Sequence, residues 1–202
     1  MLRKTGKKLA IVFLTLTFNF WLTSMVTPGW IIISKNTSKD RVDQTKISIF
    51  YITVCINDTC DSHYYRDISG VDNLLVDVPQ QVVSLLALVL CAISGILVII
   101  PINRTATKFL TVVIIIPVAA TLQSVLILLF AVVNATITSA TTGTDKVLFP
   151  YSILLSGLGT LLSIVAWVIC VVVYNNERKR ETQNQRHRMD HIEPLPVAEL
   201  PF

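Results

Sequence analysis

Residues 82–100 read VVSLLALVLCAISGILVII, nineteen consecutive residues without Asp, Glu, Lys or Arg. Folded as an α-helix, this stretch is about 28 Å long, close to the hydrocarbon thickness of a bilayer. Three further stretches share this property and cover residues 9–33, 109–133 and 148–174. Since backbone groups in lipid must be paired within their own segment, the sequence predicts four membrane-spanning helices.

The composition of the whole chain agrees with a membrane protein. Of 202 residues, 52% are apolar and 15% are charged, a balance that is unusual for a soluble domain. The net charge of +4 comes from basic residues near helix ends and does not indicate nucleic-acid binding. The basic residues 3–8, followed by the apolar run 9–33, are also typical of a cleaved signal peptide. The length of the apolar run favours a first membrane span instead.

Membrane orientation is predicted from the distribution of lysine and arginine. Eleven of the seventeen basic residues lie before residue 9, between residues 103 and 108, or after residue 177. The positive-inside rule then places both termini in the cytoplasm and residues 34–81 and 134–147 outside the cell. We therefore expect a multi-pass plasma-membrane protein with a transmembrane domain over residues 1–174 and a disordered cytoplasmic tail over residues 175–202.

The first outer loop is long enough for a small folded layer. Its residues 46–55, KISIFYITVC, are rich in β-branched and aromatic side chains and contain neither Gly nor Pro, which indicates a β-strand. Residues 31–34 and 63–65 are candidates for the neighbouring strands. The predicted fold is an α-helical membrane protein, a four-transmembrane-helix bundle with a small antiparallel β-sheet in the first extracellular loop.

Cys55 is the last residue of this strand and Cys60 follows it, in the stretch TVCINDTC. On the oxidising outer side of the membrane, two neighbouring thiols form a disulfide. A zinc site needs two further ligands, and only His63 and some carboxylates are near. The C-x4-C spacing also differs from the C-x-x-C spacing of thioredoxin-like redox sites. We therefore expect a disulfide that fixes the end of the strand.

The predicted spans contain no Asp, Glu, Lys, Arg or His, which argues against a pump or an ion-coupled carrier. Their amides are Asn19 and Gln123, for which a hydrogen bond between helices is favoured over a solute-binding pair. Small residues recur every four positions at 87, 91 and 95 and at 152, 156 and 160, which favours close helix packing. Cys170, near the cytoplasmic boundary, is a candidate palmitoylation site.

The layout of the chain resembles the claudin-like superfamily, which includes the claudins, the peripheral myelin and epithelial membrane proteins, and the transmembrane regulators of AMPA receptors. The resemblance rests on the four spans, the long first outer loop, Trp30 in the context TPGW, and the cysteine pair after a strand. The residues IFY, which end at Tyr51, stand where claudins have Gly-Leu-Trp.

The chain also departs from the claudin pattern. The two cysteines are closer together than in typical claudins, and Gln80 and Gln81 replace an Arg that often enters the second span. These differences suggest a divergent, invertebrate-type member. The resemblance implies that Trp30, Cys55 and Cys60 stabilise the outer sheet.

The tail ends in HIEPLPVAELPF, and its three prolines argue against a packed element. Leu200 and Phe202 occupy the antepenultimate and last positions, as in the hydrophobic ligands of PDZ domains. A PDZ scaffold is therefore a candidate partner of the tail.

Neither the spans nor the loops assemble a nucleophile with a base, or a set of metal ligands, so we expect no enzymatic activity, cofactor or metal. One expected function is cell–cell contact or a paracellular barrier, through the extracellular loops and at cell junctions. The alternative is an auxiliary subunit that changes the trafficking or gating of an ion channel or receptor. A membrane enzyme or solute transporter is a third, less favoured alternative. The expected partners are the lipid bilayer and other membrane proteins, in the same or the neighbouring membrane.

N-x-S/T sequons occur at Asn36, Asn57, Asn103 and Asn134. Asn36, Asn57 and Asn134 fall in the predicted outer loops and are candidate glycosylation sites. The tight ring closed by the two cysteines disfavours modification of Asn57, and nearness to the membrane disfavours that of Asn134.

Asn103 tests the predicted orientation, because it lies in the short cytoplasmic loop. After expression in glycosylating cells, we expect Asn36→Gln to increase gel mobility and Asn103→Gln to leave it unchanged. A glycan found on Asn103 would mean that the topology is inverted.

Overall fold

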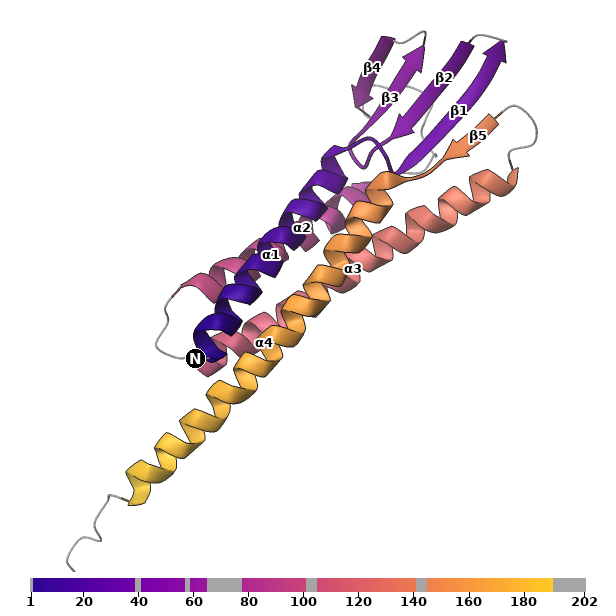
Figure 1. The fold of residues 1–202 in the computed structure, drawn as a ribbon. Coiled ribbons are helices and arrows are strands. Elements are labelled where there is room, and N and C mark those ends of the chain that lie inside the picture. Colours follow the sequence, from indigo (N-terminus) through magenta and orange to yellow (C-terminus); the bar gives the residue numbers. More distant parts are fainter. Residues whose placement is uncertain are drawn as a thin grey trace, which may run out of the picture.

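The computed structural model describes residues 2–38, 41–56, 59–64, 78–100, 105–140 and 145–190. Four long helices carry a β-sheet at one end (Figure 1). The helices are α1 (Leu2–Val26), α2 (Val78–Ile99), α3 (Thr105–Ala140) and α4 (Tyr151–Asp190). The strands are β1 (Ile31–Ser38), β2 (Arg41–Ile47), β3 (Tyr51–Ile56), β4 (Thr59–Tyr64) and β5 (Asp145–Leu148).

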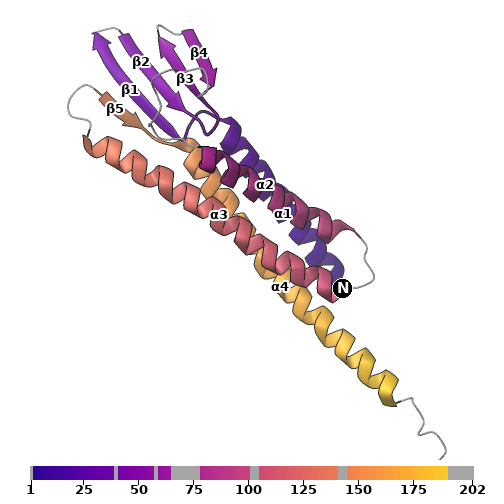
Figure 2. The ribbon, with the colours of Figure 1, turned by 180° about the vertical axis from the view of Figure 1, so that it is seen from behind.

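Each helix contains a segment that is long and apolar enough to cross a membrane. These segments are Thr5–Val26, Pro79–Ile99, Thr107–Ser139 and Tyr151–Arg186. Both α1 and α3 pack against α2 and α4, so the four helices close a ring. Seen from behind, the sheet again lies beyond one end of the bundle (Figure 2). The predicted fold is confirmed, and the chain is a multi-pass membrane protein.

The bundle core consists of apolar side chains from all four helices. Trp21 of α1, Cys91 of α2, Ile116 of α3 and Ala166 of α4 are buried in one cluster. Gly159 of α4 lies so close to the Trp21 indole that a Cβ there would overlap it. A small residue at this position is therefore what allows α1 and α4 to approach.

Pro117 lies inside α3 and has no N–H to donate to the carbonyl group four residues earlier. That carbonyl belongs to Val113, and it accepts a hydrogen bond of 2.9 Å from the indole Nε1–H of Trp167 on α4. A side chain of the neighbouring helix thus replaces the donor that proline lacks. This pairing matters in lipid, where no water is available to take the same place.

The two amides of the spans lie in different environments. Gln123 is buried, and its Nε2 donates to Ser156 Oγ on α4 at 2.6 Å, which confirms the predicted hydrogen bond between helices. Asn19 faces outward and donates to the Thr15 carbonyl, one turn earlier in α1, at 2.8 Å. The predicted hydrogen bond between helices is therefore wrong for Asn19, whose partner lies in its own helix, and the two amides do not form a solute-binding pair.

The five strands form one antiparallel sheet in the order β4-β3-β2-β1-β5. The sheet was predicted, but residues 46–55 contribute to two strands instead of one. The chain turns at Ser48, whose N–H donates to the Tyr51 carbonyl at 2.9 Å. β5 comes from the connection between α3 and α4, and the sequence did not predict it.

The helix boundaries differ from the predicted ones. α1 ends at Val26, and the last residues of the predicted first span belong to β1. α3 continues to Ala140 and includes Asn134, which was predicted to begin an outer loop. α4 continues to Asp190, so residues 175–190 of the predicted disordered tail are helical; residues 191–202 lie outside the described part. Glu, Lys, Arg and Gln are good helix formers, which explains why α4 continues beyond its apolar segment.

A double-mutant cycle tests the pairing between Trp167 and the Val113 carbonyl. Trp167→Phe is expected to lower the free energy of unfolding by about 1–3 kcal/mol, because it leaves that carbonyl without a donor. In a Pro117→Ala background the new Ala N–H donates to the Val113 carbonyl. Trp167→Phe should therefore lower the free energy of unfolding by less in that background. Unfolding in mixed micelles measures both effects, and equal costs in the two backgrounds would refute the coupling.

Candidate interaction surface

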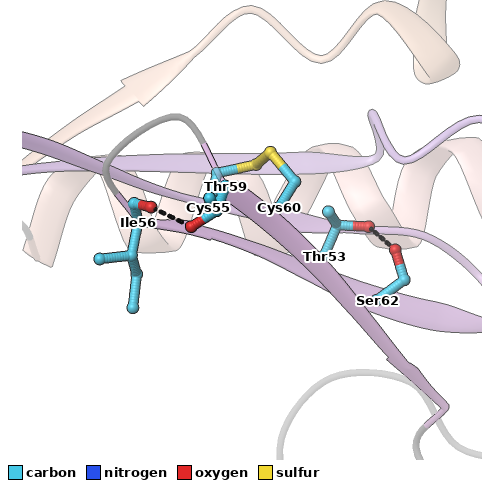
Figure 3. The surroundings of a disulfide bond; sticks show 6 residues. All are labelled: Thr53, Cys55, Ile56, Thr59, Cys60 and Ser62. Carbon is cyan, nitrogen blue, oxygen red and sulfur yellow. Dashed lines mark hydrogen bonds between the residues drawn. A yellow bond between two sulfur atoms is a disulfide. The ribbon is translucent and has the colours of Figure 1, made fainter.

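The β3–β4 hairpin lies at one edge of the sheet and is closed by the predicted disulfide (Figure 3). Cys55 and Cys60 are directly opposite each other, with Cα atoms 4.0 Å apart and an S–S distance of 2.05 Å. Because both thiols are used, the metal-clip alternative for this pair is excluded. The hydroxyls of Thr53 and Ser62 add a hydrogen bond of 2.9 Å across the same strands. These links fix the register of the hairpin.

The sheet is attached to the bundle at the end of α1. The last four carbonyl groups of a helix have no partner within it, and here residues 23–26 carry them. The carbonyl group of Ser24, the second of the four, accepts a hydrogen bond of 2.7 Å from the indole N–H of Trp30. The first, on Thr23, accepts from the backbone and the hydroxyl of Thr27 at 3.0 and 2.8 Å.

The other two carbonyl groups are paired by residues near the turn between β2 and β3. Ser48 Oγ donates to the Met25 carbonyl at 3.1 Å, and the Tyr51 hydroxyl donates to the Val26 carbonyl. Burial, and to a lesser degree the neighbouring tyrosines, raises the pKa of Tyr51 above its usual 10.0. The hydroxyl therefore stays protonated, and able to donate, throughout the physiological pH range.

Apolar contacts support these hydrogen bonds. The Trp30 side chain is fully buried, and its ring centroid lies 4.7 Å from that of Phe130 on α3. The buried residues that complete this cluster come from α1, β1, β2 and the following turn; they are Met25, Ile31, Ile47 and Ile49. Trp30 thus joins the base of the sheet to two helices.

The start of α4 holds the link between α1 and β1. The Tyr151 ring covers Gly29, where no Cβ would fit, and its hydroxyl donates to the Pro28 carbonyl at 3.0 Å. The hydroxyls of Thr27 and Ser152 lie 2.9 Å apart in a hydrogen bond. The path from helix to sheet is therefore fixed on both sides.

The outer strand of the hairpin has a different character. All six residues of β4 are exposed, and Tyr64 and the neighbouring Ile56 of β3 are large apolar side chains among the exposed ones. In the described part of the chain, β4 pairs with β3 alone. We call Ile56 and Thr59–Tyr64 the hairpin surface.

The remaining predicted sites do not gather at this surface. Asn36 lies in β1, whereas Asn57, Leu200 and Phe202 lie outside the described residues. Asn134 is buried within α3, which argues against the predicted glycosylation because an oligosaccharide needs an accessible loop. Cys170 is fully buried in the bundle core, so its thiol is not accessible for the predicted palmitoylation.

Sequence reasoning missed Ser48, Gln81 and Tyr151 as anchors of the sheet. Gln81, at the start of α2, donates to the Ile49 carbonyl at 3.1 Å. All three donate to backbone carbonyl groups, which no residue pattern marks. The only available signal was the position of Gln81, a polar residue where the second span begins.

One groove along the helices, of about 320 Å³, lies between α3 and α4, and another, of about 520 Å³, lies between the start of α1 and α4. Within the described residues, no three His, Cys, Asp or Glu side chains gather as metal ligands.

Fold and surface together define a four-span membrane protein with a disulfide-closed β-hairpin at one end of its bundle. Comparison with models of known protein families finds no match, and none of the curated proteins is significantly similar to this chain.

The importance of capping α1 is tested by comparing two buried tryptophans. Trp30→Phe keeps an aromatic ring but leaves the Ser24 carbonyl without its donor, so we expect a loss of about 1–3 kcal/mol in the free energy of unfolding. Trp21 is equally buried, but its indole N–H has no hydrogen-bond partner among the described residues. Trp21→Phe is the matched control and should cost less; an equal or larger cost would contradict the capping role.

Proposed function

We propose that the protein is a non-enzymatic, claudin-like membrane protein that acts in cell–cell contact or in a paracellular barrier. The observation that carries this proposal is the hairpin surface, a disulfide-closed strand pair whose outer strand is exposed along its whole length. This strand adds no side chain to the core, so its residues are available for binding. A rigid strand also loses little conformational entropy when it meets a partner.

The proposal requires the sheet to face the outside of the cell, with both termini in the cytoplasm and the protein in the plasma membrane. The positions of basic residues support this orientation. Lys7 and Lys8 of α1, Lys108 of α3 and Arg178 of α4 all belong to helix segments at the end opposite the sheet (Figure 1). A disulfide in the hairpin also fits an oxidising exterior.

The second candidate function is an auxiliary subunit of an ion channel or receptor. The groove between α3 and α4 favours it, because this groove lies at the proline of α3 and opens toward the lipid. Hydroxyl groups line it, from Thr121, Ser124, Thr160 and Ser163. Such a groove accommodates a side chain from a helix of a membrane partner.

The contact function predicts that the protein accumulates where two expressing cells touch, in cells that otherwise lack junctions. Tyr64→Ser should reduce this accumulation roughly fivefold or more, because a tyrosine at an interface often contributes over 1 kcal/mol. Fluorescence imaging, corrected for surface expression, measures the effect.

Phe149→Ser is the matched control, because Phe149 is 68% exposed and Tyr64 is 66% exposed. Phe149 follows β5, at the other edge of the sheet. Undiminished accumulation of the Tyr64 variant would contradict the contact function. Stoichiometric co-purification with a channel whose currents change on co-expression would instead favour the auxiliary role.

A further inference from the structure

Asn19 is a polar side chain on the lipid-facing side of α1. It lies well inside the span Thr5–Val26, and it is exposed. An amide offers two N–H donors and one carbonyl acceptor, and within the described part of the chain Asn19 forms one hydrogen bond, to the Thr15 carbonyl. Most of its hydrogen-bonding capacity therefore faces hydrocarbon, where unpaired polar groups are costly.

Other outward faces of the bundle differ from this one. The large exposed side chains of α2 are all aliphatic, as Leu85, Val89 and Ile96 illustrate. On α3, the exposed Thr121 donates its hydroxyl to the Pro117 carbonyl of its own helix, which satisfies its donor. Asn19 is thus an outward amide that its own helix satisfies only in part.

The residues around Asn19 form a regular seam along α1. Positions 12, 15, 19, 22 and 26 are separated by three and four residues in alternation, which is the spacing of a helix–helix contact between two long helices. All five are exposed: Val12, Thr15, Asn19, Leu22 and Val26. We call these five residues the α1 seam.

We propose that the α1 seam is a dimer interface, at which two copies of the chain pair in parallel and their Asn19 amides exchange hydrogen bonds. A second copy is the occupant that fits best, because an amide is both donor and acceptor and so complements itself across a two-fold axis. The flanking Val12, Leu22 and Val26 supply apolar packing on both sides.

This inference does not depend on the proposed contact function, since it concerns two copies in one membrane. It is tested with full-length protein in lipid vesicles, by energy transfer between labelled copies at a series of protein-to-lipid ratios. Asn19→Leu is expected to weaken dimerisation about three- to thirty-fold, the range for interhelical hydrogen bonds in membranes. Asn19→Gln, which keeps the amide, should retain most of the affinity.

Thr121→Leu is the control variant, because it removes an outward polar group from a different helix. Its dimerisation should equal that of the original protein. Unfolding in mixed micelles shows whether Asn19→Leu leaves the bundle stable, as expected for an exposed position.

Cross-linking locates the interface independently. Cys91 and Cys170 are buried and the other two cysteines form a disulfide, so an introduced thiol is the reactive one. Under a mild oxidant, Val26→Cys should cross-link strongly and Val82→Cys weakly. These residues are 57% and 56% exposed, but they lie on α1 and α2 respectively.

Three results obtained with the protein alone would overturn the proposal. They are a monomeric protein at every ratio, dimerisation that Asn19→Leu leaves unchanged, and equal cross-linking at positions 26 and 82. An Asn19-dependent complex with a different membrane protein, formed by a chain that is itself monomeric, would also overturn it.

Discussion

The last four carbonyl groups of a helix need partners from outside the helix, and at the sheet end of α1 the chain itself provides all of them. Thr27 donates to the carbonyl group of Thr23, Trp30 to that of Ser24, Ser48 to that of Met25 and Tyr51 to that of Val26. Three of these donors belong to the base of the sheet or to the chain that turns between its strands. The sheet is therefore held directly against the bundle, because the hydrogen bonds that cap the end of α1 also fix the position of the sheet.

The same constraint operates inside the bundle, where lipid offers no alternative partner. Pro117 removes a donor from α3, and Trp167 of α4 replaces it. Gln123 reaches Ser156 on that helix. These two hydrogen bonds join α3 to α4 at these two points, while the buried apolar residues determine which helix faces turn inward.

The parts of the fold that could be predicted from the sequence are those with local signals. Apolar runs gave the four spans, the β-branched run gave strands, and spacing together with the oxidising side gave the Cys55–Cys60 disulfide. The sequence did not reveal β5, or the anchoring of the sheet by the side chains of Ser48 and Gln81. Each of these depends on pairing with backbone groups far away in the chain, for which a single sequence carries no pattern. The helical continuation of α4 was missed because polarity was taken as a sign of disorder, although its residues favour helix.

The α1 seam lies on one face of α1, and the sheet that bears the hairpin surface is attached to the end of the same helix. α1 therefore joins the two proposed interfaces, the α1 seam and the hairpin surface. A two-fold interface closes on itself, and pairing through the seam alone therefore stops at two copies. A barrier or an extended contact needs a second, different interface. The proposed contact through the hairpin surface would meet this need, because β2 and β3 separate β4 from β1, the strand that follows α1. In the proposed assembly, pairing through the seam leaves β4 available, and dimers joined through β4 would extend into larger assemblies.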